Sequence, residues 1–327
     1  GIRDLVRSRG LGDVYKRQGL LKGKAAEAVE ACTDGYLNGL MALGPDTLGA
    51  LRARIHELLS EDDSELRGHG ALSDRLLLPA SAVHMEVPAR IGDYTDFYAS
   101  VHHATNVGSM FRPDNPLLPN YKWIPVGYHG RASSVVASGT PVPRPLGQLK
   151  ADDQEAPVYA PTRLLDYELE VGLFVGRGNE RGRPIPIGRA GEHLFGLCLV
   201  NDWSARDMQK WEYQPLGPFL AKSFLTSLSP WVVTLPALAP FRTAAEERPE
   251  GDPRPLPHLF DERDQAAGGF DISLEVFLQS AQMRERGLDP VRLSRGSFSR
   301  MYWTPAQMLA HHSSNGCDLR PGDLLAS

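Results

Sequence analysis

Carboxylates recur at alternate positions in residues 164–175, LLDYELEVGLFV. Strand periodicity would place Asp166, Glu168 and Glu170 on one face and the side chains between them on the other. One interpretation is a half-buried strand with a solvated acidic face. The other is a metal site, because like charges at neighbouring positions repel and a hard cation such as Mg²⁺ or Ca²⁺ takes carboxylate oxygens as ligands.

A further carboxylate, Asp202, follows the apolar run at 197–200 and precedes a segment rich in charged and aromatic residues. If residues 202–213 form a short helix, Arg206, Gln209 and Tyr213 share one face, since residues three and four apart are neighbours on a helix. An amphipathic surface helix has the same periodicity, so the spacing alone leaves both interpretations open.

A third segment, residues 93–106, joins acidic and aromatic residues to the adjacent pair His102 and His103. Adjacent side chains point in different directions in a helix or a strand, so the two do not form a chelating pair. One of them could be a general base, because histidine loses its proton near neutral pH, although a structural histidine also fits. His311 and His312 pose the same question without an acidic cluster beside them.

The elements that must position these residues are mostly strands. Leucines three and four apart predict a helix over residues 45–59. Strands are predicted at 164–175, 195–200, 231–233 and 272–278. Residues 243–269 are rich in charge, Pro and Gly and predict an exposed excursion. Few helices intervene, and 32 glycines and 26 prolines supply many turns, which favours a mixed β-roll or barrel over a doubly wound parallel sheet.

Composition excludes several classes of protein. The formal net charge is −5 and there is no basic block, so we expect no nucleic acid as partner. No apolar run reaches the length of a membrane span, so we expect no membrane partner either. Three widely spaced cysteines offer neither a disulfide framework nor a thiolate metal site, which indicates the cytoplasm. Dinucleotide, P-loop, HExxH, CxxC and GxSxG motifs are also missing from the sequence.

Several long stretches carry a family resemblance: IGDYTDFYAS, HHATNVG, PVGYHGRASSVV, LLDYELEVGLFVG, LVNDWSARDMQKWEYQPLGPFLAKSF and MYWTPAQMLAHHSSNGCDLRPGDLLAS. They lie between about Leu37 and Ser327, and the stretch that begins LVNDWSARD is the most specific. On these stretches the chain resembles the fumarylacetoacetase (fumarylacetoacetate hydrolase) family. The resemblance implies an α+β, mostly β fold: a mixed β-sandwich roll as the catalytic domain, with a smaller N-terminal domain that is SH3-like in the family and partial here.

The resemblance gathers the acids described above into one metal site. The metal carboxylates that it implies are Asp96, Glu168, Glu170 and Asp202. Lys222 and Thr226 match a second, structural cation position in the family. The implied cofactor is a divalent metal, Ca²⁺ or Mg²⁺, with Mn²⁺ as a further candidate.

The resemblance also distributes catalytic and substrate-binding roles. It implies His103 as the general base, rather than His102 or the later pair. The polar and cationic groups that it places around the reacting centre are Arg206, Gln209 and Lys222. The substrate contacts that it implies are Tyr98, Arg112, Tyr128, Gln209 and Tyr213.

The activity implied is metal-dependent hydrolysis of a carbon–carbon bond in 4-fumarylacetoacetate, which gives fumarate and acetoacetate in the last step of tyrosine and phenylalanine catabolism. Water activated by a histidine is the expected nucleophile. The family is cytoplasmic and homodimeric, and we expect the same here. Two alternatives stay open: a hydrolase or decarboxylase of another acyl-pyruvate-type diketo acid, and an inactive, truncated Ca²⁺-binding homologue.

The chain departs from the family pattern at both ends. We expect residues 1–18 to be a leader or scar, residues 19–92 to be a mainly helical remnant of the N-terminal domain, and residues 93–327 to be the catalytic domain without its C-terminal end. In the family, a Gly-Thr turn that contacts substrate and a Glu that orients the catalytic histidine follow that point. We therefore expect this chain to be catalytically impaired.

Overall fold

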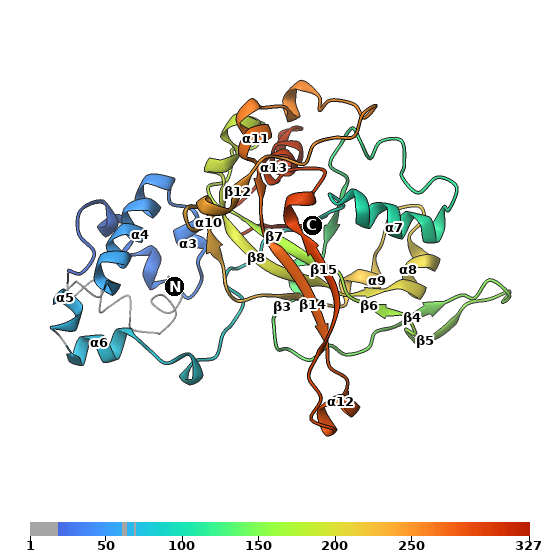
Figure 1. The fold of residues 1–327 in the computed structure, drawn as a ribbon, viewed down its shortest axis with the longest axis horizontal. Helices are drawn as coiled ribbons and strands as arrows, with labels where there is room; N and C mark the ends of the chain where they lie inside the picture. Colours follow the sequence, from blue (N-terminus) through green and yellow to red (C-terminus); the bar gives the residue numbers. More distant parts are fainter. Residues whose placement is uncertain (1–18, 61–63, 69) are drawn as a thin grey trace.

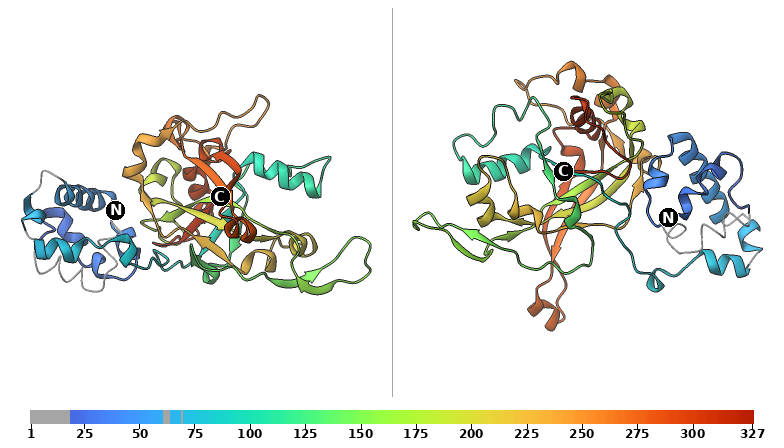
Figure 2. Two further views of the ribbon diagram at one scale, coloured as in Figure 1. Left: turned by 60° about the horizontal axis from the view of Figure 1, so that its bottom comes forward. Right: turned by 180° about the vertical axis from the view of Figure 1, so that it is seen from behind.

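The computed structural model describes residues 19–60, 64–68 and 70–327. A helical part lies to one side of a larger part built on a mixed β-sheet, and the three views agree on this arrangement (Figures 1 and 2). The expected leader, residues 1–18, lies outside the described residues.

All regular elements among the described residues from 19 to 92 are helices, which turns and irregular segments connect. They are η1 (Gly23–Ala28), η2 (Ala31–Thr33), α3 (Asn38–Met41), α4 (Pro45–Leu59), α5 (Ser64–Arg67), α6 (Gly70–Leu76) and η3 (Ala80–Ala82). The predicted helix over 45–59 is confirmed as α4, which begins at Pro45 because a proline at the first helical position gives up no hydrogen bond. Leu51 and Leu58 are buried on its inner side.

An eight-stranded mixed sheet forms the centre of the larger part. Its strands are β1 (Tyr94–Phe97), β2 (Gly127–Gly130), β3 (Val135–Ala137), β7 (Leu169–Val175), β8 (Leu194–Asp202), β10 (Thr226–Leu228), β11 (Val233–Thr234) and β16 (Leu324–Ala326). The order is β2-β1-β16-β7-β8-β10-β3, with β11 paired to β8. Two pairs, β1 with β16 and β10 with β3, are parallel and the others antiparallel. The expected α+β class with a mixed sheet is confirmed.

Four two-stranded sheets surround the central one. They are β4 (Leu146–Leu149) with β5 (Val158–Pro161), β6 (Leu165–Asp166) with β9 (Ser204–Ala205), β12 (Arg242–Thr243) with β13 (Gly269–Phe270), and β14 (Ser273–Leu278) with β15 (Val291–Ser297). The β14–β15 hairpin extends away from the body and carries α12 (Ala281–Glu285) at its tip (Figure 1).

The remaining helices fill the connections between strands. They are α7 (Val101–Phe111), η4 (Ala132–Ser134), η5 (Ile187–Glu192), α8 (Arg206–Glu212), α9 (Leu220–Ser223), α10 (Leu235–Leu238), η6 (Ala239–Phe241), η7 (Pro257–Leu259), α11 (Glu262–Ala267), η8 (Phe298–Arg300) and α13 (Pro305–Ser313). The excursion at 243–269 is only partly exposed, because η7 and α11 anchor it through the buried Leu259 and Asp264.

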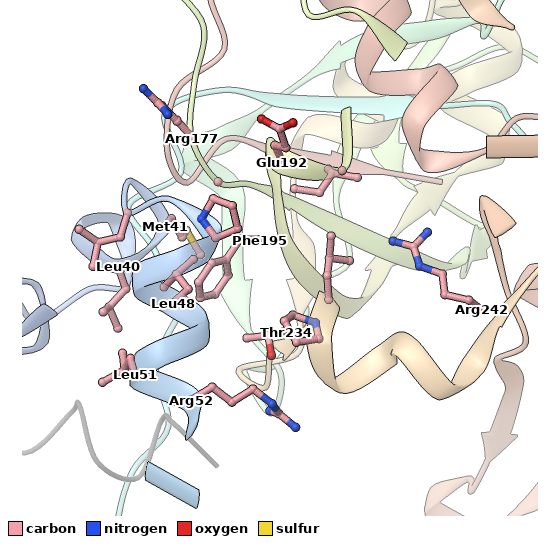
Figure 3. A pocket seen from close by; sticks show the side chains of 17 residues that line it. Leu40, Met41, Leu48, Leu51, Arg52, Arg177, Glu192, Phe195, Thr234 and Arg242 are labelled. Carbon is pink, nitrogen blue, oxygen red and sulfur yellow. The ribbon is translucent and has the colours of Figure 1, made fainter. Parts of the chain in front are cut away.

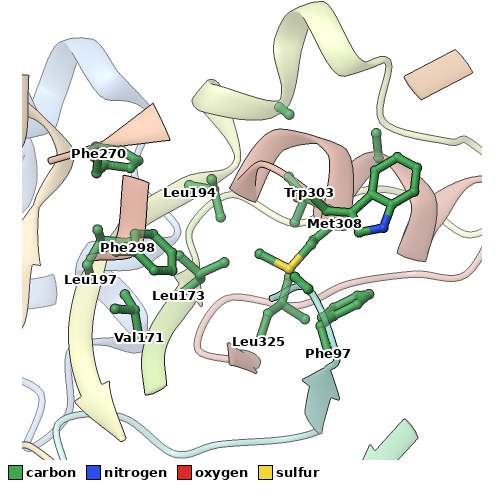
Figure 4. Packing of buried hydrophobic residues seen from close by; sticks show 14 of the residues in the cluster. Phe97, Val171, Leu173, Leu194, Leu197, Phe270, Phe298, Trp303, Met308 and Leu325 are labelled. Atoms are coloured by element: carbon green, nitrogen blue, oxygen red, sulfur yellow. The ribbon is translucent and has the colours of Figure 1, made fainter. Parts of the chain in front are cut away.

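Both faces of the central sheet are covered, so its strands are buried on two sides. From β7, Phe174 points into a core shared with the helical part, where Leu40 and Leu51 lie. Leu173 points into a second core on the opposite face, which α13 and Trp303 complete (Figure 4). Strand alternation thus divides one strand between two cores.

Gly172 on β7 supplies a test of this packing. A Cβ at this position would lie 2.8 Å from both Cys198 Sγ and Val200 Cγ2. We expect Gly172→Ala to lower the free energy of unfolding by about 1–3 kcal/mol through overpacking. Gly296→Ala on β15, where nothing lies within 4 Å of the added carbon, should change it by less than about 0.5 kcal/mol. Urea unfolding of both variants would measure this, and equal effects would contradict the packing described.

Candidate active site

Four carboxylates from three strands and one connection converge on a single point. One oxygen from each of Asp96, Glu168, Glu170 and Asp202 lies within 4.8 Å of the others. Asp96, Glu170 and Asp202 are buried, and the Glu168 side chain is 9% exposed. Such an arrangement of oxygen atoms has the donor chemistry of a site for a hard divalent cation.

Strand register produces this convergence. Asp96 on β1 pairs with Ala326 on β16, and Ala326 pairs in turn with Gly172 on β7. Glu170 lies two positions before Gly172 and therefore on the same face of β7. Asp202 is the last residue of β8, as expected from the apolar run before it, and it pairs with Thr226 on β10. Three strands therefore deliver carboxylates to one face of the sheet.

The prediction of one continuous strand over 164–175 is wrong. The segment breaks into β6 and β7, because polar side chains take the backbone donors at the junction. Tyr167 N–H donates to Asp166 Oδ1 (2.9 Å), and Glu168 N–H donates to Asn201 Oδ1 (3.2 Å). The break separates Asp166, whose side chain is 45% exposed, from the buried carboxylates. The alternative prediction of a solvated acidic strand face is therefore correct for Asp166 alone.

Two cations contact part of the cluster. Lys222 Nζ donates to a Glu168 oxygen and to Asp202 Oδ2 (2.6 Å). Arg206 donates to Glu168 Oε1 (2.6 Å) and to Asp166 Oδ2 (3.0 Å). Burial would raise the pKa of Glu168, but Lys222 above all holds that pKa well below its usual range.

Asp96 and Glu170 are compensated only in part, by the charge of Lys222 without an ion pair. Among the described residues, no lysine or arginine forms an ion pair with either of them. Burial first, and then the neighbouring carboxylates, raise the pKa of both groups well above their usual values. Glu170 Oε2 is also buried, with no hydrogen-bond partner in the part of the chain that the structure describes. Two partly compensated carboxylates and an oxygen without a donor fit one divalent cation.

His103 lies beside the cluster on the first turn of α7. Its backbone N–H donates to the capping hydroxyl of Ser100, and its Nε2 is 3.3 Å from Glu168 Oε1. The Tyr98 ring stands edge-on to the imidazole, with 5.4 Å between ring centroids. Arg112 ends the same helix, and its charge acts on Tyr98.

The other predicted residues border the same region. Of the helix expected over 202–213, only Arg206–Glu212 forms α8, because Asp202 still belongs to β8 and residues 204–205 form β9. Within α8, Arg206 donates to Gln209 Oε1 (3.0 Å), and Tyr213 follows at the C-cap. Tyr128 on β2 donates to Asp202 Oδ2 (3.0 Å), and Thr226 donates to Asp202 Oδ1 (3.0 Å). Sequence analysis missed Asn201, which fixes Glu168; nothing in its spacing indicated that role.

A cavity of about 290 Å³ lies elsewhere, between α4 and the elements β8 and α10 (Figure 3). Leu48, Phe195 and Leu235 contribute to its apolar wall, and Arg52 and Arg242 also line it. None of the acidic residues described above belongs to its lining, so the cavity is separate from the carboxylate cluster.

The fold and the site define a mixed-sheet domain with a buried acidic centre, and comparison with known proteins identifies the family. A model described as "Fumarylacetoacetate (FAA) hydrolase C-terminal" matches residues 93–327, and one described as "Fumarylacetoacetase N-terminal" matches residues 11–88. The chain belongs to the fumarylacetoacetate hydrolase family. The second match includes residues 11–18 of the expected leader.

Several curated relatives are similar over most of the chain. Fumarylacetoacetases from Bos taurus and Homo sapiens are 54% and 53% identical over 292 residues, which is 89% of this chain and 67% of each relative. The Arabidopsis thaliana fumarylacetoacetase is 46% identical over 94% of this chain and 71% of its own length. The chain thus spans about two thirds of the length of these relatives.

A solved structure of a Mycobacterium smegmatis protein, assigned as HpcE, superposes with a TM-score of 0.51 at 17% identity. It covers 92% of this chain and 78% of the other, and at this identity it supports the fold alone.

Among the described residues, no helix is both long and apolar enough to cross a membrane.

The raised pKa values generate a pH prediction. A carboxyl whose pKa is higher in the folded than in the unfolded state binds its proton more tightly when folded, so stability falls as pH rises between those two values. With chelator present, we expect Asp96→Asn to unfold at a higher urea concentration than the unsubstituted protein at pH 8, and the difference to shrink toward pH 4. Asp152→Asn, at an exposed acid paired with Lys210, should show no such gain. A wild-type advantage at pH 8 would contradict the prediction.

Proposed function

We propose that this protein hydrolyses the carbon–carbon bond between the two carbonyl-bearing parts of 4-fumarylacetoacetate, giving fumarate and acetoacetate. The observation that carries the proposal is the convergence of Asp96, Glu168, Glu170 and Asp202 beside the imidazole of His103. Relatives that are 54% identical and carry the name fumarylacetoacetase support the substrate, and they do not favour another diketo acid or a Ca²⁺-binding module without activity.

In this proposal the four carboxylates hold a divalent cation, which when bound would polarise a substrate carbonyl and stabilise negative charge on oxygen. Carboxylate ligands suit Ca²⁺, Mg²⁺ and Mn²⁺. We also propose the second cation position beside Asp202. There, Thr226 Oγ1 and Lys222 Nζ lie within hydrogen-bond distance of the carboxylate.

His103 is the proposed general base. Its Nε2 faces the acidic cluster, so this nitrogen takes a proton from water as the water oxygen adds to the substrate carbonyl. The imidazolium that results lies 3.3 Å from Glu168 Oε1, and this carboxylate stabilises it. Because Lys222 and Arg206 keep Glu168 ionised, they preserve that stabilisation.

Cleavage of the carbon–carbon bond leaves its electron pair on the acetoacetate fragment as an enolate. Carbon is a poor leaving group, so the enolate oxygen needs positive charge nearby, and Arg206 and Lys222 provide it at the edge of the cluster. A proton, returned from His103, converts the enolate carbon to the methyl group of acetoacetate. The guanidinium of Arg112 suits a substrate carboxylate, with Tyr98, Tyr128 and the face of α8 completing the proposed contacts.

The general base can be tested with two adjacent histidines. We expect His103→Ala to lower kcat by about 10²–10⁴-fold, the contribution that a positioned general base makes. His102→Ala, at the exposed neighbour on the same helix, should stay within a factor of about two. The loss of fumarylacetoacetate absorbance in the presence of Mg²⁺ or Ca²⁺ measures both. Full activity of His103→Ala would remove this residue from the mechanism.

We propose a cytoplasmic homodimer with a domain boundary near residue 93. The two family matches, which end at 88 and begin at 93, support the boundary. Exposed apolar side chains on the projecting β14–β15 hairpin support association: Phe277, Leu278, Val291 and Leu293 are 48–56% exposed. Solvent-exposed apolar groups gathered on one element are typical of a protein interface.

Association through this hairpin can be measured directly. We expect the double variant Phe277→Glu/Leu293→Glu to elute as a monomer by size-exclusion chromatography with light scattering, because the new charges would be buried without partners in a dimer. Leu59→Glu on α4, 43% exposed, should remain dimeric. A monomeric unsubstituted protein, or a dimeric double variant, would contradict an interface at the hairpin.

A further inference from the structure

Tyr94 on β1 carries a phenol group without an acceptor among the residues that the structure describes. The residue is 2% exposed, and its hydroxyl has no hydrogen-bond partner among the described residues. A buried donor of this kind is costly, since it has lost its bonds to water and gained none in return. The sequence stretch DYTDF contains this tyrosine, and none of the steps proposed above uses it.

Packing fixes where the phenol lies. Gly130 on β2 pairs with Tyr94, and a Cβ at Gly130 would lie 2.3 Å from the ring carbon Cδ1, so the ring lies flat over a position without a side chain. Tyr94 is two residues before Asp96 and therefore points to the same face of the sheet. The ring cannot move aside toward β2 without meeting that strand.

The charges of all four carboxylates in the acidic cluster act on the phenol of Tyr94. Burial, and then the charges of Asp202, Asp96, Glu170 and Glu168 in that order, raise the pKa of Tyr94 well above its ordinary value. A phenol ordinarily keeps its proton at neutral pH, so the hydroxyl can donate. An acceptor in the same cluster is also open, since Glu170 Oε2 is buried without a partner among the described residues.

We propose that Tyr94 is a positioning residue of the cation site: its hydroxyl donates a hydrogen bond to the carboxylate cluster when a divalent cation is bound there. The inference rests on the proposed function, because it requires the cation. In the bound state the donor of Tyr94 and an acceptor of the cluster satisfy each other, and the bond fixes the direction of a carboxylate that ligates the cation.

A second tyrosine provides a matched control. Tyr121 is also 2% exposed, and its hydroxyl likewise has no partner among the described residues. The groups that act on it are Tyr98 and Tyr302, and no carboxylate is among them. The two tyrosines therefore share burial and a donor without a described partner, but the charges of the acidic cluster act on Tyr94 and not on Tyr121.

The test compares Tyr94→Phe and Tyr121→Phe with the unsubstituted protein in two measurements: Mg²⁺ and Ca²⁺ binding by calorimetry, and urea unfolding in chelator. We expect Tyr94→Phe to raise the Kd for the cation five- to tenfold, about 1–1.4 kcal/mol. Its stability in chelator should be unchanged or higher, because a donor without an acceptor has been removed. Tyr121→Phe should behave in the same way in chelator but keep the original Kd.

The outcomes separate this inference from the proposed function. An unchanged Kd in Tyr94→Phe would overturn the role of Tyr94, and so would an equal rise in Tyr121→Phe. A protein that binds the cation but hydrolyses no fumarylacetoacetate would overturn the proposed function. The comparison of Kd values would then still test the positioning role of Tyr94. If the unsubstituted protein binds neither Mg²⁺ nor Ca²⁺, both are wrong.

Discussion

The contact between Lys222 and the acidic cluster is the interaction on which the site depends. Four carboxylates within 4.8 Å of one another, removed from water, repel strongly in a medium of low dielectric constant. Lys222, with a side chain only 6% exposed, donates to two of them. Burial alone would lower its pKa, but Asp202 and Glu168 raise it, so the ammonium group keeps its charge. One buried cation therefore allows Glu168 to stay ionised inside the protein.

The desolvation that makes this contact strong comes from packing on both sides of the sheet. Glu170, Gly172 and Phe174 alternate along the same face of β7, and Phe174 belongs to the core that the N-terminal helices complete. The acids thus continue a face whose remaining members are apolar. A change in how the helical part packs would alter the surroundings of the acids without touching any proposed ligand.

Much of the fold was predictable from local patterns. The leucine spacing gave α4, and the apolar run before Asp202 indicated the strand that ends there. Alternation placed Glu168 and Glu170 on one face but failed at Tyr167, because the side chains of Asp166 and Asn201 bind the backbone there and the strand breaks. Such side-chain bonds to the backbone are not encoded in periodicity.

Predicting the site took more than spacing. Residue types alone left both a solvated acidic strand and a metal site open, with the ordinary strand favoured. The adjacent histidines could not be told apart without the family resemblance. Convergence of Asp96 with Glu170 depends on a strand that lies about 230 residues further along the chain, and no local pattern predicts such pairing. Tyr94 could not be distinguished from an ordinary apolar strand residue, because an unpaired hydroxyl becomes visible only in three dimensions.

The central place of β16 has a consequence for the order of assembly. Apart from β2, β1 is hydrogen-bonded in the sheet only to β16, and β16 in turn joins it to β7. Residues 324–326 are synthesised after β1, β7 and β8, so β1 cannot pair with β16 until about 230 residues after Asp96 have been made. Non-local pairing of this kind slows folding, because a long loop must close before the contact forms. Asp96 is the first of the four acids to be synthesised, but its place beside the other three depends on a strand that is made after all of them.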